Sequence, residues 1–195
     1  MPGEAPNTAM SRVTCSSVTA SAEHLDSRER HDMETRSLTG RQLTEGDLPF
    51  VMTVWNDQRV APTIGGVRTE QQLRDRIEQW TVHWERHGFG ATLFRERTTG
   101  RAIGWGGLQH STIGIGECVT VGYVIAPSRW GCGYATEIAA ASIGHAFGEL
   151  GVDRLFASVL STNDASRRVL VKAGFAQHCE IDHGAHVEVI YAIGQ

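Results

Sequence analysis

The chain has 195 residues, of which 41% are apolar, and a formal net charge of -4 at pH 7. This length suits one domain with its own core, and the net charge, without a basic run, argues against nucleic acid as the main ligand. Four scattered cysteines, and the lack of an apolar run of signal-peptide or membrane-helix length, predict a cytoplasmic protein with no membrane partner.

The first 32 residues differ from the rest in composition. They are rich in Ser, Thr, Ala and charged residues, lack hydrophobic periodicity, and contain Pro2, Gly3 and Pro6. Such a segment buries little apolar surface, so we expect a flexible leader over residues 1–32, with a charged surface helix near residues 21–32 as the alternative. The folded domain is expected over residues 33–195.

The remaining chain mixes helical and strand patterns. A strand is expected near 36–43, helices over 44–56 and 69–88, strands near 89–95, 101–109 and 117–126, a helix over 135–150, a strand at 154–160, a helix at 164–173, and strands near 175–181 and 186–193. The helix after Thr69 is the clearest, because apolar residues recur at helical spacing from Leu73 to Trp84 before Gly88 ends it. The three strands after it indicate an antiparallel meander.

The most informative segment, TVGYVIAPSRWGCGYATE, spans residues 120–137. An apolar strand stops at Pro127, and the chain continues through Gly131 and Gly133 into a helix. Glycine lets the backbone approach an anion, and the first N–H groups of a helix, with the helix dipole behind them, bind negative oxygen. The segment therefore predicts a phosphate-binding loop for a phosphorylated cofactor.

A second motif follows about thirty residues later, where the chain reads NDASRRVL from Asn163 and KAGF from Lys172. The loop GCGYATE, followed by N-x-x-S-x-R-V-L and K-A-G-F at this spacing, resembles the GNAT acyl-CoA N-acyltransferases. Within them the chain resembles the Rim-type branch, the ribosomal-protein N-terminal acetyltransferases. The resemblance runs from Met33 to the end of the chain and is more specific than a lone G-x-G, which arises by chance in a chain with 22 glycines.

The resemblance implies a mixed α/β fold. Its sheet is strongly twisted and mostly antiparallel, contains a splayed parallel strand pair, and is flanked by about four helices. Acetyl-CoA, as a co-substrate, is expected in the gap between the splayed strands. The implied reaction is direct attack of an amine on the thioester, without a covalent enzyme intermediate.

The same resemblance implies which residues bind the co-substrate. The backbone of the central strand would pair with the pantetheine arm, backbone N–H groups of the loop would hold the pyrophosphate, and Asn163 would either hydrogen-bond pantetheine or simply cap the last helix. Trp130 stands where many relatives have a basic side chain, so the backbone groups would carry most of the pyrophosphate contact. Arg129, and Arg167 or Arg168, are candidates for supporting charge. The expected cofactor-binding residues are Tyr123, Val124, Ile125, Arg129, Trp130, Gly131, Cys132, Gly133, Tyr134, Ala135, Thr136, Asn163 and Ser166.

The catalytic residues are less regular. The tyrosine that many family members use as general acid is Leu170 here, and the resemblance to the Rim-type branch assigns this role to Ser166. In the family an acidic residue often lies on the central strand, two positions before the Gly-Tyr pair, and this position is Thr120 here. Glu117 is the expected general base. It lies five residues before Gly122, and an odd offset along a strand places it on the other face unless a bulge or loop intervenes. His110 acting through water is the alternative.

A weak base favours an amine of low pKa. At pH 7, freeing a lysine ammonium costs about 4.6 kcal/mol, whereas an α-ammonium costs about 1.2 kcal/mol. We therefore expect a protein or peptide N-terminus as acceptor. The resemblance places Trp55, Trp84 and Phe89 at the acceptor wall.

Several alternatives stay open. A small-molecule acetyltransferase, acting on an antibiotic, polyamine or amino acid, would share every cofactor residue, and a catalytically silent acyl-CoA sensor would explain the missing tyrosine. No metal site is expected, because His83 and His87 lack the H-E-x-x-H order and a third ligand. The protein is expected to be a monomer or a homodimer, the latter by pairing of an open edge at residues 187–193.

Overall fold

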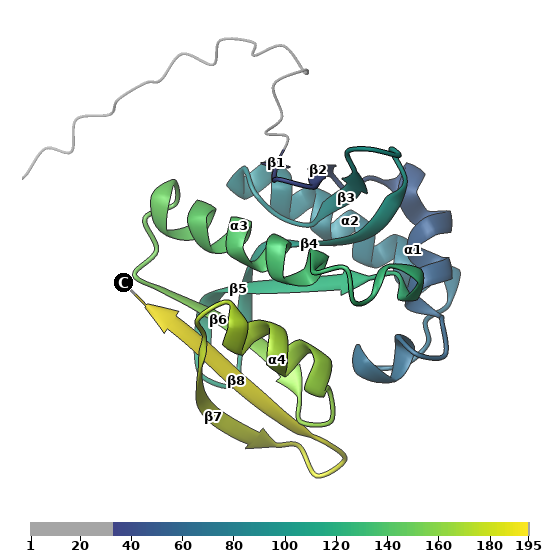
Figure 1. Cartoon of the computed structure of the whole chain (residues 1–195). Helices are drawn as coiled ribbons and strands as arrows, with labels where there is room; N and C mark the ends of the chain where they lie inside the picture. The colour runs from purple at the N-terminus through teal and green to yellow at the C-terminus, as the bar shows by residue number, and fades with distance from the viewer. Residues whose placement is uncertain (1–32, 195) are drawn as a thin grey trace, which may run out of the picture.

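An eight-stranded sheet in the order β1-β2-β3-β4-β5-β6-β8-β7 forms the centre of the computed structural model, which describes residues 33–194 (Figure 1). The predicted mixed α/β fold is confirmed, and each expected helix and strand is found within a few residues of its expected place. The predicted leader, residues 1–32, lies outside the described residues. The strands are β1 (Met33–Glu34), β2 (Leu38–Gln42), β3 (Thr92–Glu96), β4 (Ala102–Ile113), β5 (Gly116–Ile125), β6 (Arg154–Leu160), β7 (Ala176–Asp182) and β8 (Val187–Gly194), and the helices are α1 (Leu48–Trp55), α2 (Glu70–His87), α3 (Tyr134–Gly148) and α4 (Asp164–Lys172).

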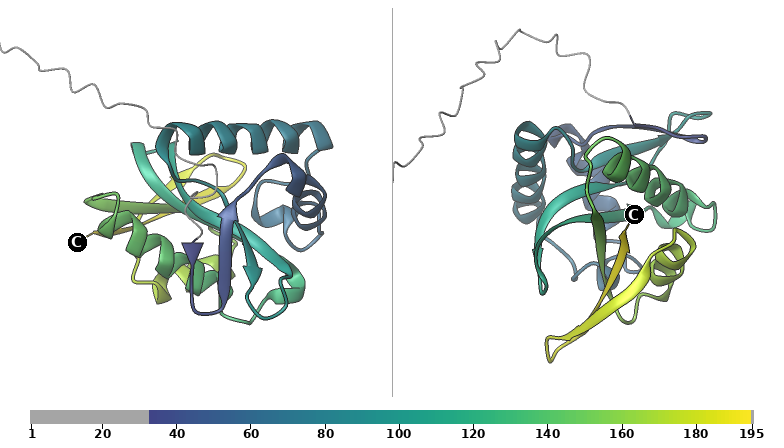
Figure 2. Two further views of the ribbon diagram at one scale, coloured as in Figure 1. Left: turned by 90° about the horizontal axis from the view of Figure 1, so that it is seen from above. Right: turned by 90° about the vertical axis from the view of Figure 1, so that its left-hand side faces the viewer.

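Helices cover both faces of the sheet: α1 and α2 lie on one face, and α3 and α4 on the other (Figure 2). On the first face Trp105 of β4 contacts Trp80 of α2 and shares a buried cluster with Leu73 and Ile77 of the same helix. On the second face buried residues of β5, β6 and β8 pack against α3 and α4. Strand β4 contributes to both layers, with Trp105 on the first face and Leu108 on the second.

Helix α2 forms as its sequence predicts. The Thr69 side chain accepts from the Gln72 N–H, and the Gln72 side chain accepts from the Thr69 N–H, which completes a capping box. At the other end Gly88 adopts φ 75°, a left-handed conformation that glycine tolerates without strain.

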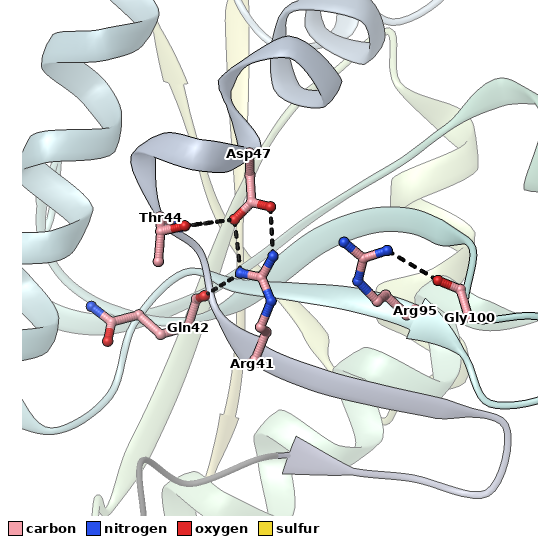
Figure 3. Close-up of polar contacts among 6 residues, drawn as sticks. All are labelled: Arg41, Gln42, Thr44, Asp47, Arg95 and Gly100. Atoms are coloured by element: carbon pink, nitrogen blue, oxygen red, sulfur yellow. Dashed lines mark hydrogen bonds and ion pairs between the residues drawn. The ribbon is translucent and has the colours of Figure 1, made fainter. Parts of the chain in front are cut away.

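The turn from β2 into α1 is fixed by a charged pair (Figure 3). The Arg41 guanidinium donates to both carboxylate oxygens of Asp47, over 2.6 and 2.8 Å. The same carboxylate accepts from the N–H and the hydroxyl of Thr44, over 2.9 and 3.2 Å. These contacts anchor the segment that leads into α1.

The parallel pair β5–β6 is the feature that creates space in the sheet. Within residues 33–194, the ladder between these strands consists of one residue pair, Thr120 with Phe156. Beyond this pair the strands run apart, as Figure 1 shows. The expected splayed pair is thus confirmed.

The closing hairpin corrects one expectation. Residues 187–193 do not form an open edge, because β8 lies between β6 and β7 and pairs antiparallel with both. The outer strand is β7 instead. Among the described residues, none of the helices combines the length and the apolar character needed to cross a membrane.

Candidate active site

The gap between β5 and β6 opens into a cavity of about 850 Å³. Its walls come from both halves of the sheet, from the loop before α3, from α4 and from the α1–α2 layer. The cavity thus joins the predicted phosphate-binding loop on one face of the sheet to an aromatic wall on the other. Most of the predicted cofactor residues line it: Tyr123, Val124, Ile125, Arg129, Trp130, Gly131, Gly133, Tyr134, Ala135, Thr136, Asn163 and Ser166. Cys132 is exposed and does not line it.

The loop before α3 has the geometry of an anion site. Gly131 and Gly133 adopt left-handed conformations, with φ 78° and 83°, and no atom lies within 4 Å of the place where a side chain would begin. No side chain caps the first turn of α3. Its backbone N–H groups therefore face an open, glycine-lined space, and this fits the phosphates of a nucleotide-containing co-substrate.

A carboxylate supports this loop from β3. Glu96 is buried and accepts a hydrogen bond from the Tyr134 hydroxyl over 2.9 Å. The same carboxylate lies 3.3 Å from Nε of Arg129. Hydrogen bonds from Thr99 and Tyr134, together with the charge of Arg129, hold the pKa of Glu96 below its usual value despite its burial. Tyr134 and Arg129 thus both contact the Glu96 carboxylate, and this contact holds Arg129 at the cavity wall.

The edge of β5 faces the gap over residues 121–125. Tyr123, within this stretch, is half-buried, and its hydroxyl donates to the backbone carbonyl of Ser166 over 3.2 Å. Burial raises the pKa of Tyr123 to about 12, although the hydrogen bond to Ser166 opposes this. The phenol therefore remains protonated at neutral pH. Sequence reasoning assigned Tyr123 a backbone role and missed this hydroxyl.

Helix α4 brings Asn163 and Ser166 to the cavity. The Asn163 side-chain oxygen accepts from the Ser166 N–H over 3.1 Å, so Asn163 caps this helix. Of the two roles expected for Asn163, the capping role is present. The structure places Ser166 one turn into α4, at the cavity wall.

The aromatic wall lies on the α1–α2 side. Trp55 lines the cavity and stacks on Trp105, with ring centroids 6.1 Å apart. Trp80 also lines it and has the guanidinium of Arg76 over its ring at 5.7 Å. Burial, followed by the nearby charge of Arg68, lowers the pKa of Arg76.

Two of the three residues predicted for this wall lie elsewhere. Trp84 donates its indole N–H to the carbonyl of Ala91 over 2.8 Å and packs close to Gly90. Phe89 is buried in the core beside Leu108. Neither residue lines the cavity. Of the predicted acceptor residues, the structure brings Trp55 to the site.

The structure does not bring Glu117 to the site. The β4–β5 ladder runs without a register shift from Gly104–Ile125 to Ile113–Gly116, so the required bulge is missing from this hairpin. Glu117 is exposed near the start of β5, at the opposite end of the strand from the phosphate loop. His110, the alternative base, is also exposed and outside the cavity lining.

His110 instead belongs to a surface histidine cluster. Its backbone N–H donates to Nε2 of His83 over 3.0 Å, and Nδ1 of His83 lies 2.8 Å from the carbonyl of Phe89. Burial and the charges of neighbouring histidines lower the pKa of His83. No group of three potential metal ligands is found among residues 33–194.

Glu188 is a cavity residue that sequence reasoning missed. It lies on β8, and its side chain accepts a hydrogen bond from the Ser158 hydroxyl on β6. The strand pattern VEVIY gives no sign of this role, because it does not reveal which face of β8 borders the gap. Among the residues described here, Glu188 is the sole carboxylate that lines the cavity.

Comparisons with known proteins agree with this geometry. A family model described as an acetyltransferase (GNAT) domain matches residues 37–176. YoaA of Bacillus subtilis, described as an uncharacterized N-acetyltransferase, is 29% identical over 146 residues, which are 73% of this chain and 81% of YoaA. The chain is thus similar to these proteins in the region that contains both motifs.

Solved structures share the fold. An acetyltransferase from Agrobacterium tumefaciens superposes with a TM-score of 0.75 at 24% identity, covering 85% of this chain and 95% of that chain. RimL, a ribosomal L7/L12 α-N-protein acetyltransferase solved in complex with coenzyme A, superposes with a TM-score of 0.70 at 16% identity, covering 84% of this chain and 98% of that chain.

Proposed function

Because the chain belongs to the GNAT acetyltransferase domain family and is therefore an acyltransferase, we propose that it transfers the acetyl group of acetyl-CoA to a primary amine. One observation carries this proposal above the others. The cavity is continuous from the glycine loop before α3, through the gap between β5 and β6, to the aromatic wall on the other face. A thioester that entered through the gap would meet an acceptor on the α1–α2 side.

We assign the co-substrate contacts as follows. Backbone N–H groups from Gly131 to Ala135 hold the phosphates, and Arg129, fixed by Glu96, adds positive charge beside them. The edge of β5 offers backbone groups to the amide arm over residues 123–125. Positioning of this kind supplies much of the rate in a reaction between two bound molecules.

The departing thiolate needs a proton. We propose Ser166 as its donor, because the hydroxyl is carried to the cavity by the first turn of α4. The Tyr123 hydroxyl lies next to the same turn and is the competing donor. The buried Leu170, where many relatives have tyrosine, contributes no proton.

For the acceptor we propose a protein or peptide N-terminus, as in the Rim-type branch. The structural likeness to RimL, which acts on ribosomal L7/L12, supports this choice. An α-ammonium group also loses its proton more readily than a lysine side chain, by about 2.5 pKa units. The aromatic wall of Trp55, Trp80 and Trp105 would pack against the first side chains of such a peptide.

A cytoplasmic location is part of the same proposal. Of the four cysteines in the sequence, Cys118, Cys132 and Cys179 fall in the described part of the chain and are free, as a reducing compartment requires. The acceptor chemistry needs no second subunit, so either a monomer or a homodimer satisfies the proposal.

Thiol release from acetyl-CoA tests the function. The panel contains peptides with varied N-termini, polyamines, aminoglycosides and amino acids, and calorimetry of CoA binding runs beside it. Turnover on a peptide is expected. Turnover confined to a small amine would move the function to metabolite or drug modification. Binding of CoA without turnover would favour a catalytically silent sensor. Leu170, which replaces the tyrosine that many relatives use as general acid, fits that alternative. Absence of CoA binding would overturn the proposal.

A further inference from the structure

Glu188 lines the cavity, on the β6–β8 side of the gap between β5 and β6. It lies at the start of β8 and pairs with Leu160, the last residue of β6. Its side chain is 27% exposed, so it is reached by solvent from one side while protein contacts it from the other. Glu117, the base expected from sequence, is far from this place.

Two neighbours fix the Glu188 carboxylate. One oxygen accepts from the Ser158 hydroxyl, and the other lies 3.3 Å from Nε2 of His183 in the hairpin turn. The His183 ring stacks on His186, with centroids 4.8 Å apart, and His186 also lines the cavity. The carboxylate is thereby held in place on both oxygens and still borders the open space.

The alternation of residues along the strands shows which side Glu188 faces. Ala157 and Val159 of β6 belong to the core beneath α3 and α4, so Ser158 between them points to the opposite face. Val189 of β8 belongs to the same core, so its neighbour Glu188 also points away from it. Glu188 and Ser158 therefore lie on the side of the sheet that carries the aromatic wall, where the acceptor is proposed to bind.

We propose that Glu188 is the general base that deprotonates the acceptor ammonium, with Ser158 and His183 as positioning residues. This inference rests on the proposed function. Many relatives have an acidic residue on β5 where this chain has Thr120, which cannot act as a base. Glu188 of β8 would supply the base from the other side of the gap. The acceptor it suits is a primary ammonium, which is attracted to a carboxylate and can donate to it.

The proton and electron balance is simple. Glu188 accepts one proton from the ammonium, directly or through one water molecule. The freed nitrogen lone pair forms the C–N bond to the thioester carbonyl, and the C–S bond breaks. The sulfur leaves with its electron pair and takes a proton from the hydroxyl donor, which regains one from the amide nitrogen formed in the reaction. Glu188 finally releases its proton to solvent.

The substitution Glu188→Gln tests the role with little change in shape, since the amide oxygen can still accept from Ser158. At pH 7, with the peptide or other amine of highest turnover in the panel, we expect kcat/KM to fall about 100-fold or more. The substitution Glu117→Gln is the matched control and should leave turnover within about twofold of wild type. The CoA dissociation constant should be the same in all three proteins.

The pH profile separates a base from a merely structural residue. Without the base, the free amine must come from solution, so turnover of Glu188→Gln should rise about tenfold per pH unit up to the pKa of the acceptor. Wild type should level off at a lower pH. The titratable groups that share this face of the hairpin are His183, His186 and, two positions along β7, Cys179. The profile is therefore repeated with His183→Gln, which should keep the wild-type shape.

Other outcomes would overturn the assignment. Turnover of Glu188→Gln within twofold of wild type, or a pH profile parallel to that of wild type, excludes Glu188 as the base. A loss of CoA binding as large as the loss of turnover assigns it a structural role instead. Wild type that binds CoA but releases no thiol with any panel amine is a failure of the proposed function itself, and it removes the role of Glu188 as well.

Discussion

Tyr123 donates its hydroxyl hydrogen to the backbone carbonyl oxygen of Ser166 over 3.2 Å, which joins β5 to the first turn of α4. The two hydroxyl groups that could protonate a leaving thiolate are therefore neighbours. Their roles differ, because the Tyr123 hydrogen is already engaged, whereas Ser166 reaches the cavity from a helix that Asn163 caps.

The first prediction separates these two hydroxyls. Ser166→Ala should lower kcat about tenfold or more without a matching change in CoA affinity, because the backbone contacts of Ser166 remain. Tyr123→Phe should lower the free energy of unfolding by about 1 kcal/mol through the lost hydrogen bond and leave kcat within about threefold. Steady-state kinetics and denaturant unfolding measure both. The reverse pattern would assign the proton donor to Tyr123.

The second prediction concerns the phosphate loop. Gly133→Val should raise the KM for acetyl-CoA about tenfold or more, because the side chain fills the open space and because a left-handed valine is strained by about 1–2 kcal/mol. Gly151→Val is the matched control, since Gly151 has φ 63° and equally open surroundings away from the loop. It should lose stability but keep the wild-type KM. Equal KM values in the two variants would contradict the assignment of the loop.

The third prediction tests the acceptor wall with two tryptophans. Trp55 and Trp84 each donate one indole hydrogen bond to a backbone carbonyl, over 3.0 and 2.8 Å. Replacing either by Phe should therefore cost about 1 kcal/mol of stability. Trp55→Phe alone should change the KM for the acceptor, because Trp55 lines the cavity and Trp84 does not. A changed acceptor KM in Trp84→Phe would contradict this division.

The fourth prediction is a pH dependence of stability at the turn drawn in Figure 3. Burial of Asp47 opposes its ionisation, but hydrogen bonds from Arg41 and Thr44 outweigh this and lower its pKa. A depressed native pKa stabilises the fold above the unfolded value near 4, and this contribution disappears as the pH falls through the native pKa.

Asp47→Asn should therefore lower the free energy of unfolding by about 2 kcal/mol at pH 7, and the difference from wild type should shrink below about pH 4. Denaturant unfolding at several pH values measures it. Asp57→Asn breaks a more exposed pair with Arg59 and should have the smaller effect. A difference between Asp47→Asn and wild type that is constant with pH would show that the charge of Asp47 is not involved.

Local signals in the sequence predicted the parts of the fold that local chemistry decides. The capping threonine and terminal glycine of α2 have their expected roles, and Gly131 and Gly133 form the open loop before α3. Such signals depend on residues a few positions apart, so they are visible without the tertiary structure.

The parts that were missed depend on how strands are ordered in space. Trp80 and Trp84 share one face of α2, but of the two only Trp80 lines the cavity, whereas Trp84 donates to the carbonyl of Ala91. Glu188 looks like an ordinary outward residue of a strand. Its role arises because β8 inserts between β6 and β7 and carries it to the gap, an arrangement that strand periodicity alone does not specify.

The junction of β5 with β6 has a mechanical consequence. In the described chain, a single residue pair connects five strands on one side with three on the other, so this seam has the shortest ladder in the sheet. A molecule bound along β5 would bridge the seam and replace interactions that neighbouring strands usually provide. Ligand binding and resistance to opening are then linked, so the lifetime of the protein against proteolysis should increase with the supply of acyl-CoA.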